Sequence, residues 1–245
     1  MELDRERVYN SPRQRLAWHQ HLLKARFKRP HKHTVQAWLP YIKQKGVALD
    51  VGAHFGYIAK ELADLKTHDL TIHAFEPIAY CHAILSKISR RRPQIIPETV
   101  ALSDQPGAFD ISIPVKASGR MGIGLSHLGA ETQRDYILEK VEVTTLDTFA
   151  DERGLENIVL IKADVEGAEG LVLKGGMEVI RRDLPTIVLE ISDAFCQRMN
   201  YRASDIFDSL TALGYQSLIY QAENQFVETA GYAGTTDYLF YHPKP

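Results

Sequence analysis

The sequence predicts one α/β domain, a mostly parallel sheet with helices on both faces, preceded by a helical N-terminal arm. From Val47 onward, apolar runs of strand length alternate with longer amphipathic stretches, which is typical of parallel sheets crossed by helices. The chain has 245 residues, of which 44% are hydrophobic, enough for one large core. No repeat or linker-like segment divides it, so a single domain is the simplest interpretation.

Residues 11–28 predict the first helix, because Leu16, Leu23 and Phe27 recur at helical spacing and Pro30 follows as a stop. The remaining elements follow from the same patterns. We expect helices at 35–42, 56–65, 78–91, 146–153, 168–182 and 204–213, core strands at 47–51, 70–75, 95–102, 158–163, 186–191, 215–220 and 238–242, and half-exposed strands at 108–114 and 140–145.

Positive charge is concentrated at the N-terminus. Residues 1–45 hold 11 Lys and Arg against 3 Asp and Glu, a net charge of +8, whereas the rest of the chain carries −10. Such an arm fits an anionic partner: nucleic acid, an anionic membrane surface or a phosphorylated substrate. The alternative is a polar helix that caps the fold and pairs with the acidic remainder.

The sequence favours a cytoplasmic protein. Its charged first residues lack the apolar core of a signal peptide, and no apolar run approaches the roughly 18 residues of a membrane span. Its two cysteines, Cys81 and Cys196, lie far apart and outside any metal-binding spacing, as expected in a reducing compartment.

A glycine turn follows the first predicted strand, with Gly52 and Gly56 in a Gly-x-x-x-Gly spacing that is neither a dinucleotide fingerprint nor a P-loop. Glu76 ends the second strand, where a carboxylate can accept hydrogen bonds from both ribose hydroxyls of a nucleoside. An acid for the ribose without a pyrophosphate turn favours S-adenosylmethionine. The alternative is that Glu76 only caps the chain before Pro77.

An acidic turn, residues 162–169, follows the strand that ends near Ile161. Because ligands of open α/β sheets bind beyond the carboxyl ends of the strands, we expect Asp164 and Glu166 to face a ligand. Two alternatives stay open. The turn could be a solvated loop, or its hard oxygens, including those of Glu169, could hold Mg²⁺.

These segments together resemble the FkbM family of S-adenosylmethionine-dependent methyltransferases. The resemblance rests on residues 50–56, Phe75-Glu76-Pro77, Ala101 to Asp104, Val143 to Asp147, Lys162 to Glu169 and Leu173 to Gly176, in this order and spacing. It implies a class I methyltransferase (Rossmann-like) fold, with a seven-stranded, mostly parallel sheet whose last strand is antiparallel. We therefore assign residues 46–245 to a methyltransferase domain and residues 1–45 to the arm, which lies outside the resemblance.

The resemblance also implies the cofactor site. Asp50 and Gly52 shape the turn on the methionine side, Glu76 binds the ribose, and Leu102, Ser103 and Asp104 lie near the adenine. Many relatives have Asn at the position of His54. The residues assigned to S-adenosylmethionine are Asp50, Gly52, His54, Gly56, Glu76, Leu102, Ser103, Asp104 and Asp164.

The implied reaction is O-methylation of a hydroxyl on a sugar, glycan or natural product. A hydroxyl acceptor usually loses its proton as it attacks, so a general base is expected. Asp164 is the first candidate and His54 the second, with Glu166 in support. The remaining candidates are Glu190 and His127. His127 belongs to the loop 115–135, which contains the glycine-rich segment 118–126 and is either a lid or a plain hairpin tip. Two other functions remain open: a nucleic-acid methyltransferase that uses the basic arm, and a nucleoside-binding module without catalysis.

Overall fold

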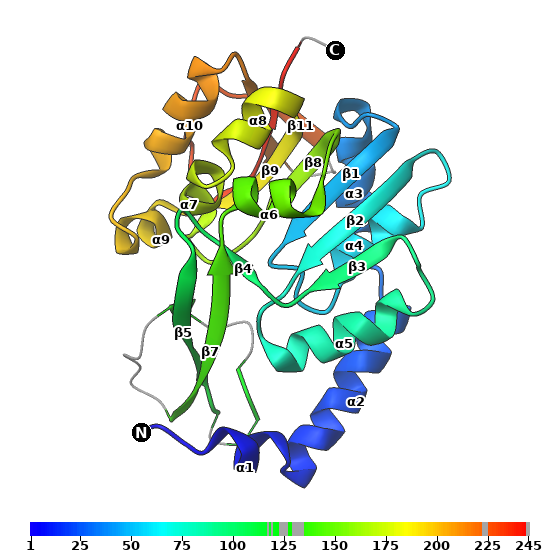
Figure 1. The fold of residues 1–245 in the computed structure, drawn as a ribbon, viewed down its shortest axis with the longest axis vertical. Coiled ribbons are helices and arrows are strands. Elements are labelled where there is room, and N and C mark those ends of the chain that lie inside the picture. Colours follow the sequence, from blue (N-terminus) through cyan, green and yellow to red (C-terminus); the bar gives the residue numbers. More distant parts are fainter. Residues whose placement is uncertain (117, 119, 123–126, 129–134, 222–224, 244–245) are drawn as a thin grey trace.

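The computed structural model describes residues 1–245 except 117, 119, 123–126, 129–134, 222–224 and 244–245. An eight-stranded sheet crosses it in the order β11-β10-β12-β9-β8-β1-β2-β3 (Figure 1). Its strands are β1 (Lys45–Val51), β2 (Asp69–Phe75), β3 (Ile95–Glu98), β8 (Ile158–Ala163), β9 (Thr186–Ile191), β10 (Gln216–Gln221), β11 (Gln225–Glu228) and β12 (Thr236–Tyr241).

Five neighbouring strands of this sheet, from β9 through β8, β1 and β2 to β3, run parallel, while β12 lies antiparallel between β9 and β10. This arrangement confirms the mostly parallel sheet with helices on both faces. Two details differ from the prediction. An eighth strand, β11, pairs antiparallel with β10. The expected strand at 95–102 is split, because the chain leaves the main sheet after Glu98 and continues as β4 (Ala101–Leu102) in a second sheet.

The second sheet has the order β4-β7-β5-β6 and contains the two strands expected to be half-exposed. They are β5 (Gly107–Pro114) and β7 (Tyr136–Thr144), with the short β6 (His127–Leu128) beside β5. Alternate β7 side chains, among them Ile137, Val141 and Val143, are buried. Figure 1 shows β5 and β7 running from the main sheet toward the N-terminal helices.

Helices cover both faces of the main sheet. One core packs the sheet against α6 (Leu146–Arg153), α7 (Glu169–Lys174), α8 (Met177–Asp183) and α10 (Ala203–Ala212); a second packs the other face against α3 (Lys32–Trp38), α4 (Tyr57–Ala63) and α5 (Ala79–Ser89). The short α9 (Asp193–Arg198) follows β9. None of the helices in the described ranges is long and apolar enough to cross a bilayer.

The N-terminal arm folds as α1 (Arg5–Tyr9), α2 (Pro12–Phe27), α3 and a 3₁₀ turn, Leu39–Tyr41. Ser11 begins α2 by accepting a hydrogen bond from the backbone N–H of Gln14. The expected helices at 11–28 and 35–42 are thus present, and α1 is additional. The face of α2 that packs against the domain carries Gln14, Ala17 and Ala25, whereas Leu16, Leu23 and Phe27 are exposed.

Candidate active site

A cavity of about 540 Å³ opens at the carboxyl ends of the parallel strands. This is the edge where open α/β sheets bind ligands, and the volume lies in the range of small-molecule sites. Turns after β1, β2 and β8 and the strands β9 and β12 contribute to it, as do the second sheet and the N-terminal arm. The side chains from these last two are Phe109, Ile111, Val141 and Val143 from the sheet and His31, Thr34 and Trp38 from the arm.

In the turn after β1, only glycine fits at position 52. Gly52 has φ +77°, and a Cβ there would lie 2.0 Å from the carbonyl oxygen of Asp164. The backbone N–H groups of Gly52 and Ala53 both donate to the carbonyl of Phe75. Gly56, at φ +76°, begins α4 and faces Leu85 of α5. Gly52 thus allows the chain after β1 to lie directly against the ends of β2 and β8 beneath the cavity, and Gly56 allows α4 to pack closely against α5.

Glu76 is 5% exposed and lines the cavity directly after β2. Its Oε1 accepts a hydrogen bond from the backbone N–H of Ile78 at 2.9 Å. Burial raises the pKa of Glu76 to about 7. The backbone N–H groups of Ile78 and His54 favour the carboxylate and lower the pKa, but burial has the larger effect. The side chain therefore does cap the chain after Pro77, but from inside the cavity rather than from the surface.

The segment after β4 lies beside the second sheet. Leu102 and Ser103 are each 5% exposed and line the cavity together with the apolar side chains of β5 and β7. Asp104 does not belong to the cavity lining. Its carboxylate instead pairs with Lys174 at 2.8 Å, and this hydrogen bond lowers its pKa.

Lys162 lies between two carboxylates at the floor of the cavity. Its Nζ is 3.6 Å from Oδ1 of Asp50 and 3.5 Å from Oδ2 of Asp164. Burial alone would lower the pKa of Lys162, but the two carboxylates outweigh it and the pKa is raised, so the side chain is an ammonium ion. Asp50 is fully buried outside the cavity lining, where its Oδ2 accepts from the backbone N–H of Ala59 in α4.

Two further carboxyl groups share this end of the cavity. Glu190 of β9 and Asp237 of β12 are register partners on adjacent strands, and both line the cavity with Asp164. Burial and the nearby Asp164 and Asp237 raise the pKa of Glu190 to about 7. Burial and Asp164 likewise raise the pKa of Asp237. Glu190 can thus take up or release a proton near neutrality.

The acidic side chains of the turn after β8 lie in two places, some in the cavity and one in the protein interior. Asp164 and Glu166 line the cavity, and burial raises the pKa of Glu166. Glu169 is 1% exposed and its Oε1 accepts from the backbone N–H groups of Val165 and Gly167 at 2.9 and 3.2 Å. It therefore holds the turn in shape. No three His, Cys, Asp or Glu side chains in the described part of the chain form a group that could hold a metal ion.

Two histidines line the cavity. His54 adopts a left-handed backbone, φ +51°, and its ring packs on Phe55 at 3.7 Å between centroids. Burial lowers its pKa to about 4, so the imidazole is neutral at pH 7. Burial and the neighbouring Lys162 lower the pKa of His31. The side chain of His127 and most of the loop at 118–126 lie outside the described residues.

The structure gathers most of the predicted site residues around one cavity. Those that line it are Gly52, His54, Glu76, Leu102, Ser103, Asp164, Glu166 and Glu190; Asp50, Gly56 and Asp104 lie behind its wall. Sequence patterns missed Lys162 as the central cation, Asp237 and the arm residues His31 and Trp38. Asp237 could have been found from the sequence as an acid within an otherwise apolar strand. No sequence pattern pointed to His31 or Trp38.

A family model described as the methyltransferase FkbM domain matches residues 50–217, more than half of the chain. The chain belongs to the FkbM methyltransferase family. A solved structure, the methyltransferase FkbM from Methylobacillus flagellatus, shares its fold at a TM-score of 0.51 and 14% identity, over 92% of this chain and 58% of that one. The class I methyltransferase fold is thereby confirmed.

Two curated proteins are similar in sequence to this FkbM family member. The 2-O-methyltransferase NoeI of Sinorhizobium fredii is 29% identical over 154 residues, which cover 57% of this chain and 61% of NoeI. The AMB antimetabolite synthetase AmbE of Pseudomonas aeruginosa is 29% identical over 206 residues, or 71% of this chain. The chain spans only about a tenth of AmbE, and less than two thirds of either relative.

Proposed function

We propose that this chain transfers a methyl group from S-adenosylmethionine to a hydroxyl of a small-molecule or glycan acceptor. The observation that carries the proposal is the buried carboxylate of Glu76 in the wall of a cavity at the carboxyl edge of the sheet. A buried acid is costly unless a ligand or the protein supplies hydrogen bonds to it. Family membership supports methyl transfer, and the name of NoeI supports an oxygen acceptor.

The residues present fit the cofactor. Glu76 would accept hydrogen bonds from the ribose hydroxyls, while Leu102, Ser103 and the apolar side chains of β5 and β7 would enclose the adenine. The tight turn at Gly52 leaves the methionine side next to Asp164. The cofactor supplies an activated methyl group as a sulfonium cation, so the protein chiefly aligns the acceptor and excludes water.

The carboxyl groups at the other end of the cavity would receive the acceptor. We assign the proton of its hydroxyl to the neighbouring pair Asp164 and Glu190, because a pKa of about 7 at Glu190 suits a general base near neutrality. Lys162 would hold Asp164 in place. His54 is a weak base with a pKa of about 4, and its role in this proposal is to form the wall beside Glu76.

Two measurements test the proposal. Isothermal titration should show binding of S-adenosylmethionine and of its demethylated product, and none of NAD; Glu76→Ala should weaken binding at least about tenfold. Transfer of radiolabelled methyl from S-adenosylmethionine to members of a panel of hydroxylated metabolites and glycosides should then identify the acceptor. Tight binding of NAD, or labelling of RNA in place of the panel, would contradict the proposal.

A further inference from the structure

Helix α2 exposes a line of large apolar side chains. Leu16, Leu23 and Phe27 are 56%, 54% and 74% exposed. At 3.6 residues per turn they lie within about 40° of one another around the helix, so they form a single stripe along it. Small residues on the opposite face, Ala17 and Ala25, are buried against the domain. Trp18 and Leu22 also pack against the domain, so Leu16, Leu23 and Phe27 are large apolar residues of α2 that remain exposed and form a surface for an interaction.

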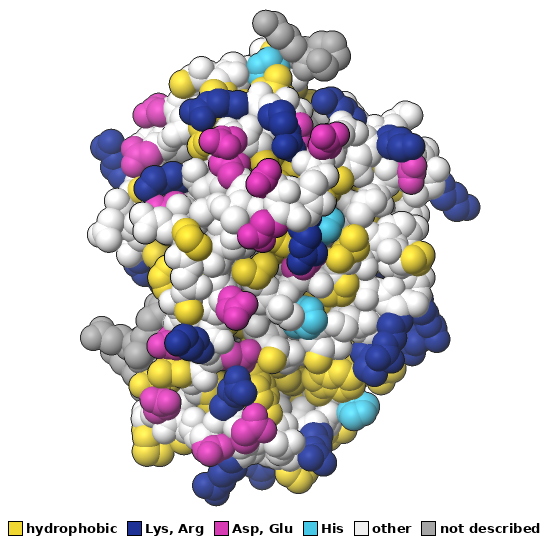
Figure 2. Space-filling model, in the orientation of Figure 1, with side chains coloured by type: hydrophobic (Ala, Val, Ile, Leu, Met, Phe, Trp, Pro, Cys, Tyr) yellow, Lys and Arg dark blue, Asp and Glu magenta, His cyan; other side chains and the backbone are white. Residues whose placement is uncertain are grey.

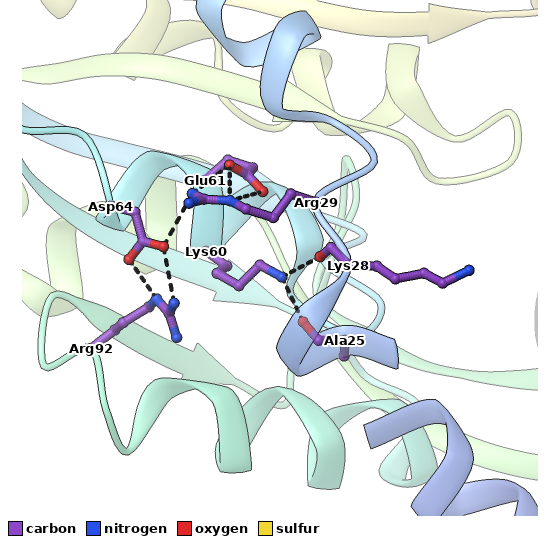
Figure 3. A network of polar contacts seen from close by, with 7 residues as sticks. All are labelled: Ala25, Lys28, Arg29, Lys60, Glu61, Asp64 and Arg92. Carbon is purple, nitrogen blue, oxygen red and sulfur yellow. Dashed lines mark hydrogen bonds and ion pairs between the residues drawn. The ribbon is translucent and has the colours of Figure 1, made fainter. Parts of the chain in front are cut away.

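Exposed cations border the stripe on both sides. Arg13 and Lys24 lie about 60–80° from its centre on one side, and Arg15 and Arg26 about 80–100° on the other. Lys28 follows the helix, and Figure 3 shows its side chain extending away from the neighbouring polar groups. Figure 2 shows Lys and Arg side chains gathered at the lower right of the view, where Figure 1 places the ends of α2 and α5.

A network of polar contacts around the buried Lys60 and Glu61 fixes the end of α2 to the domain (Figure 3). Lys60 of α4, 1% exposed, donates from Nζ to the carbonyl oxygens of Ala25 and Lys28 at 2.6 and 2.5 Å. Arg29 donates to both carboxylate oxygens of Glu61 and pairs with Asp64. The two bonds from Lys60 satisfy carbonyls at the end of the helix. The stripe is thus presented from a fixed helix, not from a loosely attached tail.

We infer that this surface, the apolar stripe of α2 with its flanking cations, docks the protein on an anionic lipid membrane. A helix of 16 residues, about 24 Å long, can lie flat at the headgroups with Leu16, Leu23 and Phe27 among the upper acyl chains. Arg and Lys beside them reach up to the lipid phosphates with their long side chains. Each such cation near an anionic leaflet strengthens binding about fivefold.

Other occupants fit the surface less well. Nucleic acid would use the cations but would gain nothing from three apolar side chains at the centre of the contact. A second copy packed stripe to stripe would bring the cation rows of both copies together. Three side chains on one helix also bury far less than the roughly 1,200 Å² typical of a stable interface.

The surface lies close to the cavity. His31, which lines the cavity, follows Phe27 by only four residues, so the two lie within about 14 Å of each other. Docking at α2 would therefore hold one wall of the cavity near the bilayer.

Sedimentation of the full chain with lipid vesicles tests the inference. We expect binding to phosphatidylcholine vesicles that contain about 30% phosphatidylglycerol, at least about tenfold tighter than to pure phosphatidylcholine, and weakened by salt. The triple variant Leu16→Ser, Leu23→Ser, Phe27→Ser should weaken binding at least about tenfold. Lys24→Gln with Arg26→Gln should have a similar effect through charge alone.

Matched controls separate this surface from general stickiness. Ile96→Ser removes an exposed hydrophobic side chain from β3, and Lys66→Gln removes an exposed cation elsewhere; both should bind like the wild type. Unchanged melting temperatures would show that the variants are folded, and Phe27→Ser alone serves if the triple variant is not. Three results would overturn the inference: no binding of the wild type to anionic vesicles, equal binding of wild type and triple variant, or a wild-type dimer that the triple variant converts to monomers.

Discussion

Replacing Glu76 by glutamine should stabilise the ligand-free protein above neutral pH while impairing its binding of cofactor. Glu76 is buried in the cavity wall, and burial raises its pKa from 4.5 to about 7. The folded protein therefore holds this proton more tightly than the unfolded chain does. Stability from this group is complete below about pH 4.5, falls as pH rises, and is lost above about pH 7.

The size of the effect follows from the two pKa values. A difference of about 2.5 units corresponds to about 3 kcal/mol of the free energy of unfolding. Glutamine stays neutral and its oxygen can still accept from Ile78, but its amide N–H₂ needs a new partner, at a cost of about 1 kcal/mol. The net gain at pH 8 is about 2 kcal/mol, or about 4–8 °C in melting temperature for a chain of this length.

Urea denaturation of ligand-free wild type and variant at several pH values between 5 and 9 measures this difference. The advantage of Glu76→Gln should be absent at pH 5 and should grow through pH 7. Glu178→Gln, which removes an exposed carboxylate from α8, provides the control for a lost surface charge. A difference between wild type and Glu76→Gln that stays constant from pH 5 to 9 would refute the reasoning, because it would mean that Glu76 does not hold a proton in the cavity.

Three more predictions concern the same cavity. Affinity for S-adenosylmethionine, measured by isothermal titration, should fall about tenfold per pH unit below pH 7 in the wild type and stay flat in Glu76→Gln, since the ribose needs the ionised carboxylate. Once an acceptor is found, kcat/KM should rise to a plateau above about pH 7. Asp164→Asn and Glu190→Gln should each lower turnover at least about 100-fold, which is more than they weaken cofactor binding; normal turnover in both would exclude this pair as the base. Gly52→Ala should cost several kcal/mol of stability or prevent folding, since its Cβ would meet the Asp164 carbonyl, whereas Gly231→Ala, with open space around it, should be neutral; equal denaturation midpoints would contradict this.

The sequence predicted the parallel core well, because its strands are continuous apolar runs bounded by turn residues. It could not predict that the third strand is split. Glu98 ends β3 in contact with His73 and Arg153, and the chain then turns to place Leu102 and Ser103 at the cavity. That change of sheet depends on partners from distant segments, which local hydrophobicity does not record.

The spacing of apolar residues also could not predict which face of α2 packs against the domain. The spacing of its apolar residues predicted a helix correctly, but its fully buried residues are Gln14, Ala17 and Ala25, with Trp18 and Leu22 partly buried beside them. Alanines allow close approach to α5, and the side-chain oxygen of Gln14 accepts from the backbone N–H of Met121 at 3.1 Å. When both faces of a helix carry apolar residues, the one that packs is decided by its neighbours.

The residues of the site could likewise be predicted only in part from the sequence. Glu76 and Asp164 were predicted because they follow parallel strands, whose carboxyl ends meet at one edge. Asp237 escaped this rule because β12 is antiparallel, so a residue near its beginning reaches that edge, opposite Glu190 near the end of β9. Only the strand order reveals such a residue. The family resemblance assigned Asp50 to the cofactor site, and the structure places it behind the cavity lining, paired with Lys162.

The charged groups around Lys162 would couple the two parts of the proposed reaction, methyl transfer and removal of the acceptor's proton. Asp50 and Asp164 lie beside the ammonium group of Lys162, and Glu190 and Asp237 add two carboxyl groups at the same end of the cavity. A cationic sulfonium nearby would lower the pKa of Glu190 and leave its carboxylate free to accept a proton. Because methyl transfer would remove that positive charge, the pKa of Glu190 would rise again as the acceptor hydroxyl gave up its proton. Under the proposed function, loss of the cation and uptake of the proton thus favour each other at one group of side chains.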